Sequence, residues 1–333
     1  MEAGSLIPRA TVRGGRSIDE RSPRSRAIDP LLKWFLSGLA ALILVLIAFF
    51  FIRLFIEAKP AFDKFGYIGF VFDNSWVPSQ QLYGALPLVV GTLITSAIAL
   101  IIGVPVAIAT ALYITELAPT RVKAPLTVTV ELLAAVPSVV YGLWGIAVLA
   151  PKLQPAEQWF SDTFGFLPLV GGQVSIPNYF IAGLILAIMI IPIVSAISRE
   201  VMATVPGDHK EAALALGATR WEMIKIAVLP YSRAGISGAA MLGLGRAIGE
   251  TIAVTIVIGN AADIGNTIFS QGYTLAAVIA NEFGEAASDP THRAALIAAG
   301  LVLFVLTLLV NALARYYVNR ASRPASVPKG MAG

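Results

Sequence analysis

Long apolar blocks separated by polar connections dominate the pattern of this chain. The first block contains no charged residue over 19 positions, and a helix of that length spans a hydrocarbon core of about 30 Å at about 1.5 Å per residue. Five further blocks are similar. The six blocks are residues 34–52, 86–114, 125–150, 176–196, 234–259 and 294–314. The pattern therefore predicts an all-α integral membrane fold with six transmembrane helices.

Composition supports this interpretation and excludes several classes of chemistry. Only 13% of the 333 residues are charged, whereas soluble domains carry about 25%. The chain has no cysteine, which excludes disulfides, thiolate catalysis and cysteine-bound metals. Its two histidines, His209 and His292, fall in predicted loops, where we expect solvated side chains. We therefore expect neither a catalytic residue nor a metal site in this chain.

The distribution of lysine and arginine predicts the orientation. If the N-terminus lies inside the cell, eighteen of these residues fall on cytoplasmic segments and five on outer loops, with Arg246 inside a span. Both termini are then cytoplasmic. Residues 1–30 are predicted to be a disordered basic tail, residues 31–320 the transmembrane domain, and residues 321–333 a cytoplasmic C-terminal tail. Basic residues at the edges of spans explain the net charge of +4, so no nucleic-acid partner is expected.

A charged pair stands inside the fifth span. Arg246 and Glu250 lie in a glycine-rich apolar stretch, four residues apart, which would place them on one face of a continuous helix. Each such charge costs roughly 2.5–3.5 kcal/mol at the centre of a membrane helix, so it persists mainly where it pairs or faces a polar path. A guanidinium matches the oxygens of an oxyanion. The pair therefore indicates an anion path or, alternatively, a salt bridge that only fixes helix packing.

Glycines around this pair favour helix packing over nucleotide binding. Gly245 and Gly249 are four residues apart, as are Gly235, Ala239 and Gly243, and such small-residue faces let membrane helices approach closely. A dinucleotide fingerprint would need a strand–turn–helix context, which the pattern does not provide. The chain also lacks a Gly-x-x-x-x-Gly-Lys-Ser/Thr phosphate-binding loop, so we expect it not to hydrolyse ATP itself.

Three residues of the third span are weaker candidates. Glu131 lies near the cytoplasmic end of that span, where it could reach the surface, bond to an inner loop or take part in transport. Pro137 predicts a helix kink, and Ser138 or a neighbouring helix could bond to a carbonyl that the kink frees. We interpret these residues as a gate or as packing features.

The longest cytoplasmic connection, residues 198–232, predicts short amphipathic helices along the membrane surface. A glycine offers a break between them, and a proline is expected to end the second. The connection resembles the EAA signature of ABC importer permeases, except that Ala227 stands where isoleucine is usual. The residues that carry the signature are Glu211, Ala212, Ala213, Gly217, Leu229 and Pro230. In that family this loop forms the coupling helix that docks on the ATP-hydrolysing subunit, so the resemblance assigns these residues to coupling.

Further segments narrow the resemblance. Residues 113–119, 131–142, 243–251 and 280–283 look like the PstC-type permease of the phosphate-specific ABC importer. The likeness covers roughly residues 33–317. It implies the fold of a type I ABC importer permease and a location in the bacterial inner membrane. It also implies a phosphate path that includes Arg246 and Glu250.

The same resemblance implies the partners. They are a second, similar permease, two ATP-binding subunits that hold ATP and magnesium, an extracytoplasmic phosphate-binding protein, inorganic phosphate and the lipid bilayer. No cofactor is expected in this chain. Closure of the ATPases would act through the coupling loop and open the outer side around Arg246, which is an alternating-access mechanism.

Two other functions stay open. A secondary anion transporter would predict inverted repeats and interrupted helices in matched halves, and the sequence shows no internal repeat. A permease for another oxyanion, such as molybdate or sulfate, would share the class but not the segments 243–251 and 280–283. Phosphate import by an ABC complex is therefore the preferred interpretation.

Overall fold

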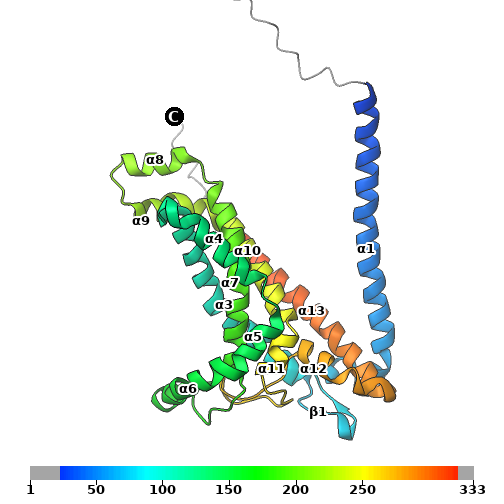
Figure 1. Ribbon diagram of the computed structural model, residues 1–333. Helices are drawn as coiled ribbons and strands as arrows, with labels where there is room; N and C mark the ends of the chain where they lie inside the picture. The colour runs from blue at the N-terminus through cyan, green and yellow to red at the C-terminus, as the bar shows by residue number, and fades with distance from the viewer. Residues whose placement is uncertain (1–22, 322–333) are drawn as a thin grey trace, which may run out of the picture. The chain divides into compact units, whose positions relative to one another are not determined.

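The structure, a computed structural model, describes residues 23–321 and is predominantly helical, as the apolar blocks predict (Figure 1). Most of the predicted N-terminal tail, and all but one residue of the predicted C-terminal tail, lie outside these residues. The chain divides into two units, residues 1–53 and 54–333. The described part of the first unit belongs to α1 (Pro23–Phe65), whose apolar side chains from Leu31 to Ile52 are exposed. Such a helix is typical of one that faces lipid.

The second unit contains every other element. Its helices and strands follow in the order α2 (Tyr67–Phe72), β1 (Trp76–Val77), η1 (Pro78–Gln80), β2 (Leu82–Tyr83), α3 (Leu86–Leu112), η2 (Tyr113–Leu117), α4 (Thr120–Ala134), α5 (Ser138–Trp144), η3 (Gly145–Leu149), α6 (Ala150–Phe164), α7 (Tyr179–Ala203), α8 (Gly207–Ala215), α9 (Arg220–Met223), η4 (Ile224–Val228), α10 (Leu229–Gly249), α11 (Ile252–Val257), α12 (Leu275–Glu282), η5 (Glu285–Ser288) and α13 (Pro290–Ala321). The segments η2, η3 and η4 are π-helical turns, and β1 pairs with β2 in a short antiparallel hairpin.

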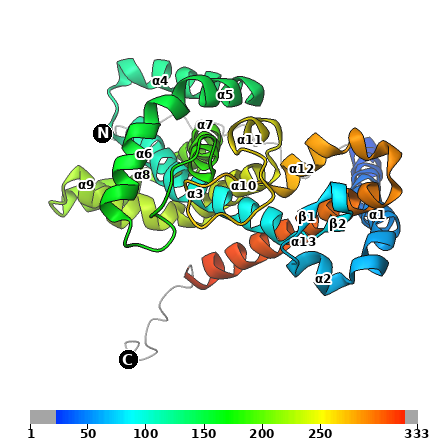
Figure 2. The same cartoon turned by 90° about the horizontal axis from the view of Figure 1, so that it is seen from below.

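The central helix of this unit is α7. It packs against α3 and α10, and Figure 2 looks nearly along it, with α3, α10 and α11 around it. Its apolar side chains surround the whole helix, which is typical of a buried element. Close approach to α3 requires glycine at two positions, since a Cβ on Gly183 would meet Ile98 at 2.5 Å and one on Gly103 would meet Ile190 at 2.8 Å.

The start of α7 is fixed by side chains. Asn178 accepts a hydrogen bond from the backbone N–H of Ile181 at 2.8 Å, which satisfies one of the free donors of the first turn. The amide group of Asn178 also donates to Glu157 of α6 at 3.0 Å. This cap explains why α7 begins at Tyr179, three residues later than the apolar pattern predicts.

Within residues 23–321, four helices are long and apolar enough to cross a membrane, and a fifth span is bent. The four are Pro30–Phe65, Leu86–Leu117, Tyr179–Ala203 and Pro290–Tyr316. The bent span consists of Thr120–Ala134 and Ser138–Phe164, whose axes differ by 89°. The predicted total of six stays a prediction.

The bend shows that the third span is broken rather than kinked. Pro137 has an extended backbone (φ −59°, ψ 140°) directly before α5, and α4 ends at Ala134. Proline disfavours helical geometry at the residue before it, which explains the interruption. The hydroxyl of Tyr141 donates to the carbonyl of Leu133 at 2.8 Å, in addition to a longer bond of 3.4 Å from the backbone N–H of Val136 at the end of α4. The sequence assigns such a bond to Ser138 or to a neighbouring helix, and the structure shows Tyr141 of the neighbouring helix α5 in this role.

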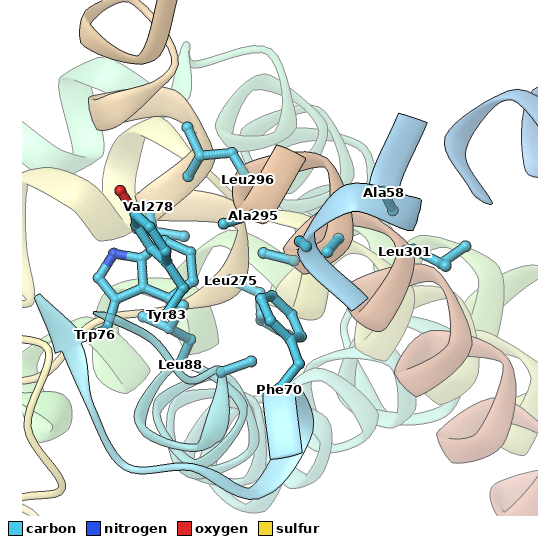
Figure 3. Packing of buried hydrophobic residues seen from close by; sticks show 14 of the residues in the cluster. Ala58, Phe70, Trp76, Tyr83, Leu88, Leu275, Val278, Ala295, Leu296 and Leu301 are labelled. Carbon is cyan, nitrogen blue, oxygen red and sulfur yellow. The ribbon is translucent and has the colours of Figure 1, made fainter. Parts of the chain in front are cut away.

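The end of the unit that holds the hairpin, α12 and the start of α13 is built around aromatic rings (Figure 3). Trp76 and Tyr83 are register partners of the hairpin, and their rings lie 5.2 Å apart. Tyr83 also stacks on His292 at 5.3 Å. Glu282 accepts a hydrogen bond from Trp76 Nε1 at 3.1 Å and lies 2.9 Å from His292 Nε2. We call Phe70, Trp76, Tyr83, Glu282 and His292 the aromatic end.

The aromatic end corrects two expectations. The side chain of His292 is buried within α13, not solvated in a loop, because Asp289 accepts the backbone N–H groups of Thr291 and His292 and starts the helix before them. The segments expected to be outer loops also contain elements of their own. These elements are α2, the hairpin, α6 and α12.

Candidate functional site

The structure places Arg246 in the last turn of α10, which ends at Gly249. Glu250 follows with an extended backbone (φ −69°, ψ 127°). The two residues therefore do not share one helical face, and no ion pair joins them in the described part of the chain. The predicted helical pair is wrong in this conformation, because the helix stops one residue before the carboxylate.

Glu250 instead contacts the start of α11. Its Oε1 atom accepts the backbone N–H of Ala253 at 3.4 Å. A carboxylate is favourable at this position, since the free N–H groups of a helix N-terminus carry partial positive charge. Glu250 therefore helps the chain to change direction between α10 and α11.

The glycines near Arg246 fall into two groups. A Cβ on Gly235 would meet Val201 at 2.4 Å and one on Gly243 would meet Val194 at 2.7 Å, so these two glycines pack on α7 as predicted. A Cβ on Gly245 or Gly249 would meet nothing within 4 Å. The packing prediction is wrong for this second group within the chain, and the surface around them is open.

Arg246 is exposed beside these open glycines. Tyr141 belongs to α5, which packs on α11, the helix that follows Glu250. Leu132, before the break of the bent span, is exposed as well. We call the surface formed by Arg246, Gly245, Gly249, Tyr141 and the break at residues 135–137 the arginine face. It combines a cation that has hydrogen-bond donors with small residues and apolar neighbours, which suits an anion.

The predicted coupling loop forms two short helices, α8 and α9. Glu211 and Ala212 of α8 are exposed, whereas Ala213 is buried against residues of α7, α9 and η4. The loop turns at Gly217, which has a positive φ of 86°, so the predicted break is confirmed. Just before it, Leu216 is 89% exposed, and Leu214 and Trp221 nearby in the loop are 43% and 53% exposed. Large apolar side chains that are exposed as a group are typical of a contact surface.

Pro230 does not end a helix as expected. The chain passes from α9 through η4 into α10, where half-buried Leu229 is the first residue and Pro230 the second. A proline is tolerated there because its missing N–H would have no helical partner at the start of α10.

Several polar contacts near the coupling loop were not predicted. Glu131 of α4 pairs with Arg199 of α7, with Nη2 and Oε1 3.1 Å apart, and Arg199 also donates to Thr127 at 2.9 Å. Lys210 of α8 pairs with Glu116 of η2. Opposite charges at the ends of predicted spans were the only signal in the sequence, and that signal does not identify which residues meet.

The comparisons with known proteins agree with this architecture. The family model described as "Binding-protein-dependent transport system inner membrane component" matches residues 103–323. The chain belongs to this family. The permease fold therefore accounts for the helical architecture, and the location is the bacterial inner membrane, with several membrane-spanning helices.

Relatives of this permease show which kind of permease within the family it resembles. It is 45% identical over 286 residues to the phosphate transport system permease protein PstC of Mesorhizobium japonicum, covering 84% of this chain and 87% of the relative. It is 39% identical over 325 residues to PstC of Xylella fastidiosa, covering 96% and 98%. The permease is thus of the PstC type. In a solved bacterial ABC transporter involved in the import of alginate, one chain has the same fold, with a TM-score of 0.59, 20% identity and coverage of 90% and 100%.

Proposed function

We propose that this permease forms, with a second similar permease, the path of an ATP-driven importer of inorganic phosphate. The observation that carries the substrate class is Arg246, an exposed guanidinium without a carboxylate partner in the described residues, set beside open glycines. The names of the PstC relatives support phosphate as the anion. No observation favours molybdate or sulfate.

The chemistry of Arg246 suits this substrate. A guanidinium offers a rigid, two-pronged set of N–H donors that matches phosphate oxygens. Because Glu250 contacts the start of α11, it leaves this charge available to an anion. A rearrangement of the junction between α10 and α11 would bring the carboxylate toward Arg246, where it would compete with phosphate and favour release.

The proposed complex also contains two ATP-binding subunits and an extracytoplasmic phosphate-binding protein. ATP and magnesium would bind to the ATPase subunits, and this chain would bind no cofactor. The exposed residues of α8, with Leu216 at its end, are the proposed contact for an ATPase subunit. We place α8 and α9 on the cytoplasmic side, as the lysine and arginine distribution predicts.

Uptake of labelled phosphate by the complete complex in proteoliposomes tests this function. Arg246→Ala is expected to lower uptake by more than about 30-fold, because it removes the charge that meets the anion. Arg246→Lys keeps the charge without the two-pronged geometry, so its phosphate uptake should lie between that of the unmodified complex and that of Arg246→Ala. The matched control is Arg293→Ala, since Arg293 is exposed at the start of α13, away from the arginine face.

Normal phosphate uptake by an assembled Arg246→Ala complex would contradict the anion-path assignment. Sulfate and molybdate serve as competitors, and effective competition by either would indicate a different oxyanion. Uptake that proceeds without the ATPase subunits would indicate a secondary transporter.

A further inference from the structure

The coupling helix α8 is joined to the end of α3 by one largely buried ion pair. Lys210 Nζ lies 2.7 Å from Glu116 Oε1, and the two side chains are 23% and 8% exposed. Fully exposed ion pairs contribute little, but this one is mostly withdrawn from water. The loss of one partner would leave the other charge poorly compensated. The contact joins residues 94 positions apart in the chain.

Apolar contacts of α8 with the rest of the molecule are slight by comparison. Of the residues in α8, all of which the structure describes, only Ala213 is buried. The ion pair is therefore the main polar contact between α8 and the membrane helices, beside a ring contact of 6.2 Å between His209 and Tyr231 of α10.

The π-helical turn that carries Glu116 is also held by α4. Lys123 Nζ donates to the carbonyl of Thr115 at 2.7 Å. The last carbonyls of a helix have no partner within it, and a lysine is favourable there. Two lysines, from α8 and α4, thus hold two adjacent residues of η2.

From α4 the polar contacts continue to the arginine face. Arg199 of α7 donates to Thr127 and Glu131 along α4. The hydroxyl of Tyr141 then joins the two sides of the break by its hydrogen bond to Leu133. Each element from α8 to α5 is therefore in contact with the next, and α5 packs on α11, which follows Arg246 and Glu250 in the chain.

We propose that Glu116 and Lys210 are positioning residues that transmit the movement of α8, through η2, to α4 and the bend beside Arg246. The proposal rests on the coupling role of α8 stated above. It assigns a transport role to the segment 113–119, which in itself looks like a helix end. Neither residue contacts the anion.

The first test measures phosphate import and ATP hydrolysis by the complete complex in proteoliposomes. Glu116→Gln and Lys210→Met are each expected to lower the phosphate imported per ATP hydrolysed by on the order of 10-fold. The hydrolysis rate and the amount of assembled complex should stay near those of the unmodified protein. The double variant Glu116→Lys/Lys210→Glu restores an opposite-charge pair and should recover import. Glu200→Gln is the matched control, because Glu200 is exposed at the end of α7.

Three results would overturn the proposal. Import and hydrolysis that fall together, in proportion to the amount of assembled complex, would mean that the pair only stabilises the fold. Failure of both single variants to assemble would mean the same. Unchanged import per ATP in both variants would mean that the pair is not needed for coupling.

A second test follows movement without using the anion. Because this chain has no cysteine, spin labels can be attached to Val128→Cys on α4 and Val305→Cys on α13 without removing any other thiol of the permease. ATP with vanadate should change the distance between the labels on α4 and α13, and Glu116→Gln should abolish that change. The distance from Asp208→Cys on α8 to Val305→Cys should still change in the same variant.

A change of the α4 distance that survives Glu116→Gln would refute the proposal, as would the absence of any change in the unmodified complex. The outcomes also separate the two hypotheses. A complex that moves α4 with ATP but does not import phosphate would contradict the proposed substrate and leave the role of Glu116 supported.

Discussion

The aromatic end and the α8–α9 region of the second unit are held together by different kinds of contact. At the aromatic end, Phe70, Trp76 and Tyr83 are at most 5% exposed, and their rings stack or meet edge to face. In the α8–α9 region, large apolar side chains such as Leu216 and Trp221 are more than half exposed. That region has a smaller buried cluster, which includes Met223 and Ile224, and it also relies on an ion pair, a glycine turn and π-helical turns.

This difference indicates which part of the molecule moves. Burial of a large apolar side chain contributes about 1.5–3 kcal/mol, and close-packed rings cannot shift without losing that contribution. Single polar contacts near the surface contribute about 1 kcal/mol or less and can exchange partners. Regions with few buried apolar contacts open most easily. We infer that the aromatic end is the fixed part of the permease and the α8–α9 region is the mobile part.

The largest expected effect compares a tryptophan from each region. Trp76→Ala removes a buried ring that packs on Tyr83 and donates to Glu282, and it should lower the free energy of unfolding by about 3–5 kcal/mol. Trp221→Ala removes an exposed ring that contacts Lys225 at 5.0 Å, and it should cost about 1 kcal/mol or less. Thermal unfolding of both variants in detergent measures the difference. Equal losses would remove the distinction between a fixed and a mobile region.

An intermediate effect is expected at Gly217, the turn between α8 and α9. A Cβ there meets nothing within 4 Å, so Gly217→Ala should cost about 1–2 kcal/mol through backbone strain at positive φ alone. Gly207→Ala is the control, because Gly207 also has open space around it but an ordinary backbone. Hydrogen exchange should show faster exchange in α8 and α9 only for the first variant. Similar exchange in both variants would show that the turn does not depend on left-handed geometry.

The sequence predicted most of the helices because long apolar blocks identify membrane spans without reference to their partners. It also located the turn at Gly217, since glycine followed by a new amphipathic segment is a local signal. The broken third span was only partly predictable. Pro137 indicates an interruption, but the angle of 89° depends on the packing of α5 against α11.

The candidate site was predicted less well for a related reason. Residues 243–251 are all compatible with a helix, so the pattern did not show that α10 ends at Gly249 and separates Arg246 from Glu250. The contact between Lys210 and Glu116 joins distant segments, and a charge pattern does not reveal such a pairing. Arg246 itself was found, because a single cation inside an apolar span is visible without any structure.

The smallest expected effect concerns a weak point of the aromatic end, the hydroxyl group of Tyr83. It is buried and has no hydrogen-bond partner in the described part of the protein. Burial, and then the negative charges of Asp289 and Glu282, raise the pKa of Tyr83 from 10.0 to about 12. The folded protein therefore disfavours the tyrosinate. The contribution of the neutral Tyr83 phenol to the free energy of unfolding is fully present below pH 10.0 and is lost as the pH rises toward about 12.

Tyr83→Phe should therefore not lower the free energy of unfolding at neutral pH, in contrast to Trp76→Ala. At neutral pH the variant should be as stable as the unmodified protein or gain up to about 1 kcal/mol, because an unsatisfied buried hydroxyl is removed. In the alkaline range it should lose less stability than the unmodified protein, since it has no phenol to ionise. Thermal unfolding from neutral to alkaline pH measures both effects on stability. Tyr67→Phe is the control, because the ring of Tyr67 is exposed. A clear loss at neutral pH would mean that the hydroxyl has a stabilising partner and that polar contacts also hold the aromatic end together.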